Sequence, residues 1–406
     1  MATRPIQSSR GRAERGRKLH RQLDVFVGKP LVACAGVAHK AARFFRPLPP
    51  AVPSSLKDVK RVGVFTLGAI GDLLLVTALL SGLRRELPEA EIEVITSKAN
   101  AAVVPLLPED TTSASFSITD IRGMVSHIRA ARYDIFIDTS QWARIGALVS
   151  AVSGAGRTVG FSTPGQHRHY AYDHIVPHRN DRHEKDNFLA LGRVLFPELT
   201  GEPEIRIPET PSIACKTLPD SKVVFCHMWG SGLYPHLKEW PANYWGGLAV
   251  SLADAGYTVI FTGDPQNAPA TERFLEWQIP ASYLDKNSIR SIAGKINLPD
   301  LAYCLRRADA VISVNTGIMH LAAIAGAPTI ALNGAVNPLR WGPLGPKTCA
   351  LLPEKGRSAY LNLGFEYEDT RDNVLRHLRV KTVRDALAEF GIYVSDNGGQ
   401  QSEVAA

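Results

Sequence analysis

A repeated order of segments most constrains how this chain can fold: a short apolar run, a turn of small residues, then a stretch with a helical pattern. The run at 61–67 is rich in Val and Phe and leads through Gly68-Ala69-Ile70-Gly71 into an apolar stretch at 73–87. Such runs predict buried strands, and the longer stretches predict crossover helices. Further strands are predicted at 91–96, 133–138, 158–161, 222–227, 258–262, 310–314 and 328–332. This alternation predicts parallel sheets covered on both faces, the α/β class.

The predicted strands form two series, separated by a polar, Pro-rich stretch at 162–212. Helices are predicted at 143–153, 185–195, 244–255, 270–277, 298–307, 319–325 and 383–390. Two series of similar size indicate two Rossmann-like domains facing a central cleft. We therefore expect a basic extension with a Pro-rich linker at 1–55, domains at 56–210 and 211–375, and a closing helix with a polar tail at 376–406.

The positive charge of the chain is concentrated at its N-terminus. Residues 1–50 contain eleven Lys and Arg residues and two acidic residues, a charge of +9, whereas residues 51–406 sum to −2. The middle of this arm, 25–37, is apolar but interrupted by Lys29 and Pro30. The arm could lie on an anionic membrane surface, could be a solvated segment, or could be a secretory signal, against which Lys29 counts. The nearly neutral remainder offers no second basic patch, so nucleic-acid binding is not expected.

Several classes of protein are excluded by what the sequence lacks. No uncharged apolar stretch is long enough to span a bilayer. The five cysteines are scattered and never spaced as Cys-x-x-Cys, which indicates a reducing compartment and offers no structural zinc site. There is no Asp-x-Asp and no His/Glu cluster with metal-ligand spacing, so no metal is expected. A Gly-x-Ser-x-Gly nucleophile motif is also absent.

The first candidate motif is Leu67-Gly68-Ala69-Ile70-Gly71-Asp72-Leu73, at a predicted strand-to-helix turn. Small residues let the backbone approach a ligand, and the start of the helix offers free N–H groups. It is not a GxGxxG fingerprint, because its glycines are three residues apart. Asp72 has two interpretations at this point: it caps the helix, or it acts as a general base at the ligand edge of a parallel sheet.

A second strand-to-helix turn contains Asn315-Thr316-Gly317, with His320 one turn into the predicted helix. Thr316, Gly317 and the backbone amides that follow would form an anion-binding helix N-terminus. His320 could contact the ligand or could be a packed helix residue.

Two weaker motifs follow other predicted strands of the second series. His227-Met228-Trp229-Gly230-Ser231-Gly232 precedes Lys238, a combination suited to a diphosphate, although Lys238 could equally be a solvated loop residue. Gly263 ends a further strand, where a nucleoside could contact the backbone.

Together these motifs resemble the ADP-heptose:lipopolysaccharide heptosyltransferase family, glycosyltransferase family 9. The resemblance covers about residues 60–390. It rests on 64–72 with Thr77, Leu79, Leu80, Leu83 and Arg84, on 133–138 and 157–161, and most specifically on 315–323 with Pro328, 331–334, Asn337-Pro338 and 341–343.

The resemblance implies a GT-B fold and inverting, metal-independent sugar transfer from a nucleotide-sugar, ADP-heptose, without a cofactor. The acceptor would be a lipid-anchored glycan such as the lipopolysaccharide core, bound by the N-terminal domain at the cytoplasmic face of the membrane. Asp72 matches the base that deprotonates the acceptor hydroxyl, beside an acceptor-side loop of Gly68, Ala69 and Gly71. The C-terminal domain would bind the donor through Lys238, Ser231, Gly263, Asn315, Thr316, Gly317 and His320.

The chain also departs from the pattern of the family. Asn315 stands where the family commonly has Asp, and the loop after Cys226 reads His227-Met228-Trp229-Gly230 instead of His-Pro-Gly, with a longer spacer before Lys238. The alternatives left open are a transferase that uses another donor sugar, a family member that binds a nucleotide-sugar or glycan without catalysis, and a nucleotide-dependent oxidoreductase. We expect a cytoplasmic protein, with its arm at the inner face of the membrane.

Overall fold

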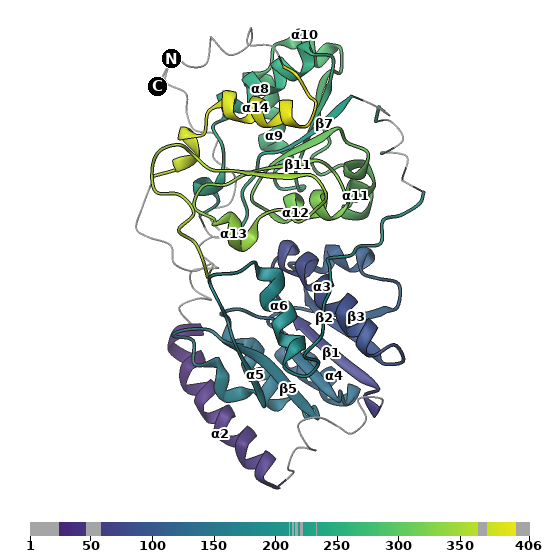
Figure 1. Cartoon of the computed structure of the whole chain (residues 1–406), viewed down its shortest axis with the longest axis vertical. Helices are drawn as coiled ribbons and strands as arrows, with labels where there is room; N and C mark the ends of the chain where they lie inside the picture. The colour runs from purple at the N-terminus through teal and green to yellow at the C-terminus, as the bar shows by residue number, and fades with distance from the viewer. Residues whose placement is uncertain are drawn as a thin grey trace. The chain divides into compact units, whose positions relative to one another are not determined.

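The computed structural model describes residues 24–45, 58–210, 212, 215, 218–219, 222–232, 234–363 and 372–394. Their contacts divide them into two compact units, which meet in sequence between Arg206 and Ile207 (Figure 1). We call them the N-terminal and C-terminal units. Three predicted parts lie outside the described residues: the basic extension before Asp24, the Pro-rich linker and the polar tail after residue 394.

The N-terminal unit is built on a six-stranded sheet in the order β3-β2-β1-β4-β5-β6, with every pairing parallel. Its strands are β1 (Arg61–Thr66), β2 (Glu91–Ser97), β3 (Thr111–Phe116), β4 (Ile135–Asp138), β5 (Arg157–Ser162) and β6 (His174–Pro177). Its helices are the π-helical turn η1 (Asp24–Gly28), α2 (Lys29–Phe45), α3 (Ile70–Glu86), η3 (Ala101–Leu106), α4 (Ile121–Ala131), α5 (Arg144–Val152), η4 (Arg168–Ala171) and α6 (Glu184–Arg193).

The C-terminal unit repeats this plan, again fully parallel, in the order β12-β11-β10-β7-β8-β9. Its strands are β7 (Val223–His227), β8 (Thr258–Thr262), β9 (Ile289–Ser291), β10 (Ala310–Val314), β11 (Thr329–Leu332) and β12 (Thr348–Leu351). Its helices are η5 (Pro235–Lys238), α8 (Ala242–Asp254), α9 (Ala268–Gln278), α10 (Ala281–Asp285), α11 (Leu298–Arg306), α12 (Gly317–Ile324), α13 (Pro338–Trp341), η6 (Val374–His377) and α14 (Val380–Glu389).

Both sheets have the Rossmann order of strands, in which the chain fills one half of the sheet and then returns to the centre to fill the other. The order therefore reverses between β1 and β4 in the first sheet, and between β7 and β10 in the second. Ligands of such sheets bind beyond the carboxyl ends of the strands at this topological switch point. The loops that follow these four strands are consequently the places to look for a site.

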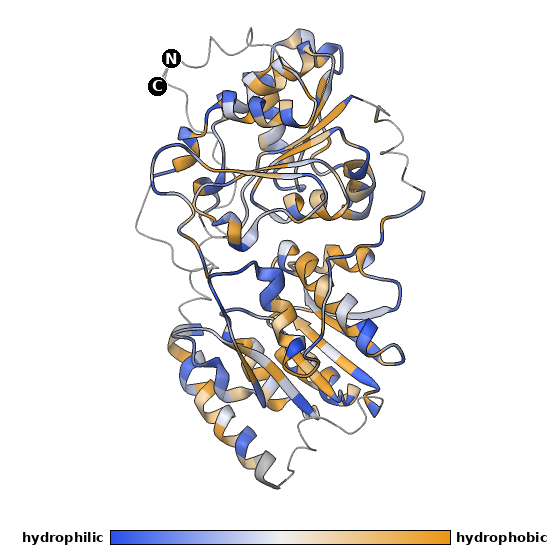
Figure 2. Cartoon of the chain, viewed as in Figure 1, coloured by the Kyte–Doolittle hydropathy of each residue, from blue (hydrophilic) through white to orange (hydrophobic). Residues whose placement is uncertain are grey.

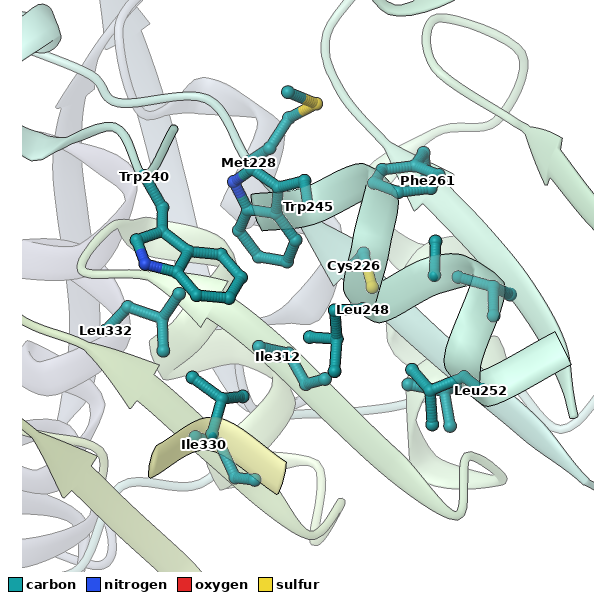
Figure 3. Close-up of a cluster of buried hydrophobic side chains, with 14 of the residues drawn as sticks. Cys226, Met228, Trp240, Trp245, Leu248, Leu252, Phe261, Ile312, Ile330 and Leu332 are labelled. Carbon is teal, nitrogen blue, oxygen red and sulfur yellow. The ribbon is translucent and has the colours of Figure 1, made fainter. Parts of the chain in front are cut away.

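Apolar residues explain why these strands form. All residues of β4, β7, β10 and β11 are buried, as expected for strands covered by helices on both faces. In the C-terminal unit, β7, β10 and α8 meet in one core through Cys226, Ile312 and Leu248 (Figure 3). Trp240 and Trp245 pack there edge to face, with ring centroids 5.1 Å apart. The inner strands also carry the most hydrophobic colours of the sheets in Figure 2.

Every strand predicted from the sequence is present, but four strands and four α-helices of the described residues were missed. The missed strands are β3, β6, β9 and β12, and the missed α-helices are α2, α4 and the short α10 and α13. The polar stretch at 162–212 contributes both β6 and α6, which pack against β5 and α3. None of the described helices is long and apolar enough to cross a membrane.

The segment at 24–45 of the basic arm is helical and packed against the N-terminal unit. Helix α2 contacts α5 and η4, and its inner face includes the fully buried Val32. This segment is therefore not a solvated arm.

Candidate active site

Asp72 lies at the switch point of the N-terminal sheet, in the first turn of the helix that follows β1. Ala69 is the N-cap residue of α3, and its backbone N–H donates to Oδ2 of Asp72 over 2.9 Å. Asp72 thus makes half of a capping box from the third position of the helix. An ideal Cβ at position 68 would lie 2.5 Å from Oδ2 of Asp72, so a larger residue there would displace the Asp72 carboxylate.

Gln141 reaches Asp72 from the other side of the same switch point. It lies in the loop after β4, and its Nε2 donates to Oδ1 of Asp72 over 3.1 Å. The carboxylate is therefore held by one donor on each oxygen, one from each loop that borders the switch point. Each oxygen keeps lone-pair capacity for a ligand hydroxyl. No motif of the sequence pointed to Gln141.

The surroundings of Asp72 favour its protonated form. Burial raises the pKa of its carboxyl above the usual 3.8, and the charge of Glu184 raises it further, whereas the hydrogen bonds from Ala69 and Gln141 and the nearby His178 lower it. Asp72 as a residue is half-buried, and burial of its carboxyl is the largest cause of the raised pKa. A carboxylate with a raised pKa is a stronger base than aspartate in water.

A buried network fixes the loop that carries Gln141. Arg168 Nη2 donates to Oδ2 of Asp138 over 2.5 Å, and the Tyr172 hydroxyl donates to the same oxygen over 2.6 Å. Arg168 also donates to the carbonyl oxygen of Ser140. Both charged side chains of this pair are fully buried, so the pair is screened from solvent. The backbone next to Gln141 is consequently held in place by the body of the unit.

The loop after β10 occupies the switch point of the C-terminal sheet. Thr316 is the N-cap residue of α12, yet its side chain makes no capping hydrogen bond. Thr316 is only 7 % exposed, and its Oγ1 has no hydrogen-bond partner among the described residues. A buried hydroxyl without a partner is unusual in proteins. The start of α12, with Gly317 as its first residue, therefore offers free backbone amides and a hydroxyl together.

Asn315 has a defined role in the architecture of this loop. Its Nδ2 donates to Oδ1 of Asn333 over 2.7 Å and to the carbonyl oxygen of Trp341 over 2.8 Å. A carboxylate at this position could donate to neither acceptor. The carboxamide of Asn315 is thus accommodated by neighbouring acceptors, and position 315 brings no charge to this loop.

Lys238 and Ser231 are brought together beside the other strand of the switch point, β7. The Nζ of Lys238, from η5, donates to the carbonyl oxygen of Ser231 over 3.1 Å. The preceding Gly230 N–H donates to Oε1 of Glu239 over 3.0 Å. The loop is therefore closed on itself by the segment that carries the lysine.

Gly263 is half-buried, like Lys238, whereas His320 is buried. A Cβ at Gly263 would lie 3.3 Å from Cδ1 of Trp229, so the ends of β7 and β8 are in close contact. His320 is 4 % exposed in the second turn of α12. One hollow of the C-terminal unit, of about 410 Å³, lies between α9 and β9 and is lined by Glu272, Arg290 and Lys295. None of the predicted site residues lines it.

Within the described residues, no three or more His, Cys, Asp or Glu side chains are grouped as metal ligands would be. The candidate donor loops instead bring positive charge through Lys238 and through the N-terminus of α12.

Comparison with known proteins identifies the family. Residues 121–363, more than half of the chain, match the sequence profile of glycosyltransferase family 9 (heptosyltransferase). The chain belongs to this family. It is accordingly a glycosyltransferase, and the oxidoreductase interpretation is set aside. The matched segment includes the Asn315 and Lys238 loops but not Asp72.

Relatives agree with this assignment over most of the chain. Lipopolysaccharide heptosyltransferase 3 of Escherichia coli is 24% identical over 298 residues, which cover 67% of this chain and 83% of the relative. A glycosyltransferase family 9 structure from Veillonella parvula superposes with a TM-score of 0.66 at 20% identity, over 83% of this chain and 98% of that one. The structure of E. coli ADP-heptose lps heptosyltransferase II superposes with a TM-score of 0.64 at 19% identity, over 82% of this chain and 98% of that one. The two Rossmann-like units, each with a parallel sheet, are thus those of the GT-B fold.

Proposed function

We propose that this glycosyltransferase transfers a heptosyl group from ADP-heptose to a hydroxyl of a lipid-anchored glycan of the lipopolysaccharide core. The observation that carries the proposal is the Asp72 carboxylate, held by two donors at a switch point with a raised pKa, in a chain of family 9. The names of its relatives suggest the donor and the acceptor: ADP-heptose and lipopolysaccharide.

The proposed reaction is a single displacement with inversion at the anomeric carbon. The acceptor oxygen forms a bond to this carbon while the bond from the carbon to the diphosphate oxygen breaks. The electron pair of that bond leaves with ADP, and the acceptor proton passes to Asp72. A general base of this kind contributes about 10²- to 10⁴-fold to the rate. In this proposal the N-terminal unit, with Gly68, Ala69 and Gly71 next to Asp72, binds the acceptor.

The C-terminal unit would hold ADP-heptose by its diphosphate. The amides at the start of α12 and the Thr316 hydroxyl would donate to phosphate oxygens, and Lys238 would exchange its carbonyl partner for the diphosphate. These groups stabilise the negative charge that develops on the leaving ADP. Because protein groups supply this charge, we propose that transfer needs no metal ion and persists in the presence of a chelator. Gly263 would lie beneath the nucleoside.

A different donor sugar is the alternative that one observation favours. The Asn315 carboxamide is bound to Asn333 and to the backbone of Trp341, so its loop presents no carboxylate to the sugar. A site built for a sugar hydroxyl discriminates strongly through such groups. A change from carboxylate to amide therefore bears on which sugar is accepted.

A screen of nucleotide-sugars tests the function. Wild-type protein and the Asp72→Asn variant are incubated with a panel that includes ADP-heptose and with envelope lipid extract, and release of nucleoside diphosphate is followed. Lipid-dependent release of ADP from ADP-heptose by wild type alone is expected. Release from another nucleotide-sugar would establish the alternative donor. Binding of a nucleotide-sugar without turnover by any extract would favour a non-catalytic member of the family.

A further inference from the structure

Helix α2 has apolar residues on both of its faces, and only one face is packed against the protein. The packed face includes Val32, Gly36 and His39 of α2 and Gly28 of η1, which leads directly into α2, and their spacing of three to four residues forms one stripe. A Cβ at Gly36 would lie 2.7 Å from Cβ of Tyr170, so the helix approaches η4 closely. The stripe is thus the docking face of α2.

Polar contacts anchor η1 and α2 at two points. At the start of η1, Asp24 Oδ2 accepts from Nη1 of Arg144 over 2.6 Å, and Arg144 is almost fully buried. Towards the end of α2, Nε2 of His39 lies 2.9 Å from Oδ1 of Asp173, and both side chains are buried. The orientation of the helix about its own axis is therefore fixed, and so is the face that it turns outward.

The outward face is apolar. Phe26 is 79 % exposed, Leu31 48 % and Val37 71 %. Among the side chains that the structure describes, up to Ala41, the other exposed residues of this face are equally uncharged: Val27, Pro30, Ala33, Cys34, Ala38 and Ala41. Figure 2 shows hydrophobic colours on most turns of α2. A surface helix normally turns charged and polar residues outward, so this face indicates an interaction.

Positive charge borders the apolar face. Lys29 and Lys40 are exposed, and their spacing of eleven residues places both on the same flank, between the packed and the outward face. The Nζ of Lys40 lies 5.8 Å from the ring centroid of the partly exposed Tyr170. Residues 1–23, which precede the helix in sequence, contain seven Lys and Arg residues and one acidic residue.

We propose that the outward face of α2 binds an anionic phospholipid bilayer, with its apolar residues in the interfacial region and its flanking lysines among the headgroups. Apolar residues flanked by Lys and Arg are the pattern of interfacial helices. The charge selects the occupant: a bilayer of opposite sign attracts the basic segment, whereas a second copy of the chain would bring the same charge to the contact. This inference extends the proposed function but does not rest on it.

Vesicle co-sedimentation of the full chain tests the proposal. Vesicles of phosphatidylethanolamine with phosphatidylglycerol are compared with vesicles of phosphatidylcholine, and neither contains a glycan acceptor. The variant Leu31→Glu/Val37→Glu changes the outward face. The matched control, Ile118→Glu/Ile121→Glu, changes two isoleucines of the same unit that are 43 % and 50 % exposed beside β3 and α4. All four sites are exposed, so both variants should fold, which thermal unfolding checks.

We expect wild type and the control to bind the anionic vesicles, more weakly at high salt, and the α2 variant to bind at least about tenfold more weakly. Three results would overturn the proposal: no binding by wild type, equal binding by the α2 variant, or an equal loss in the control. If light scattering without vesicles showed dimers of wild type and of the control but monomers of the α2 variant, the face would be assigned to a second copy of the chain instead.

Discussion

Asp72→Asn separates the two roles that the structure gives to this side chain, helix capping and general base. Asparagine keeps the shape and can still accept from the Ala69 N–H, so the variant loses the negative charge, its basicity and the oxygen that accepts from Gln141. Loss of the base should lower kcat by about 10²- to 10⁴-fold. Loss of the negative charge near the N-terminus of α3 by itself lowers the free energy of unfolding by about 0.3–1 kcal/mol.

The raised pKa of Asp72 opposes this loss of stability. Because the folded protein raises the pKa of Asp72, the ionised carboxylate is less stable in the fold than in the unfolded chain. This unfavourable contribution is present above the folded pKa and disappears as the pH falls below 3.8, where the group is protonated in both states. At neutral pH the variant should therefore unfold within about 2–4 °C of wild type or slightly above it, and the difference should shrink on acidification.

The assay compares turnover and thermal unfolding of wild type, Asp72→Asn and a matched capping control. Asp120 is the exposed N-cap residue of α4 and accepts from the Gly123 N–H over 3.0 Å, so Asp120→Asn alters a helix cap away from the site. We expect the control to keep full turnover. Wild-type turnover by Asp72→Asn would refute the base assignment, and a loss of several kcal/mol of stability would show that capping is its main role.

Three further substitutions test other parts of the account. Gln141→Leu removes a hydrogen bond that lowers the pKa of Asp72, so the acidic limb of the kcat/KM profile should move to higher pH; an unmoved limb would contradict the contact. Thr316→Val should weaken ADP binding about tenfold in calorimetry without loss of stability, because its hydroxyl has no partner to lose; unchanged affinity would remove Thr316 from the donor site. Arg168→Met leaves a buried carboxylate unpaired and should cost about 3–5 kcal/mol in denaturant unfolding, and a change below about 1 kcal/mol would show that the network is not structural.

The sequence predicted the interior of both sheets and missed their borders. The eight predicted strands are the inner strands of the two sheets, and β3, β6, β9 and β12 are the four edge strands. Inner strands are covered on both faces and paired on both sides, so they need continuous apolar residues. An edge strand does not: β3 reads Thr-Thr-Ser-Ala-Ser-Phe and is largely exposed. Pairing with β2, which the local sequence does not encode, makes it a strand.

The site was predictable to the extent that it is local. Asp72 and Thr316 each follow a strand directly, so a short motif predicted their places. Gln141 lies 69 residues from Asp72, and the two meet because β1 and β4 are neighbours. No local pattern distinguishes Gln141 from any other loop glutamine. The sequence also showed that the basic arm has an apolar middle, but not that one face of it packs against α5.

The most direct test of the central claim is mass spectrometry of the acceptor. A heptose-deficient lipopolysaccharide acceptor is incubated with ADP-heptose and purified protein in the presence of a chelator, and the mass of the glycolipid is measured. The account predicts a gain of one heptosyl unit with wild type and almost none with Asp72→Asn over the same time. An unchanged glycolipid, with ADP-heptose intact and both proteins folded, would contradict heptosyl transfer to this class of acceptor.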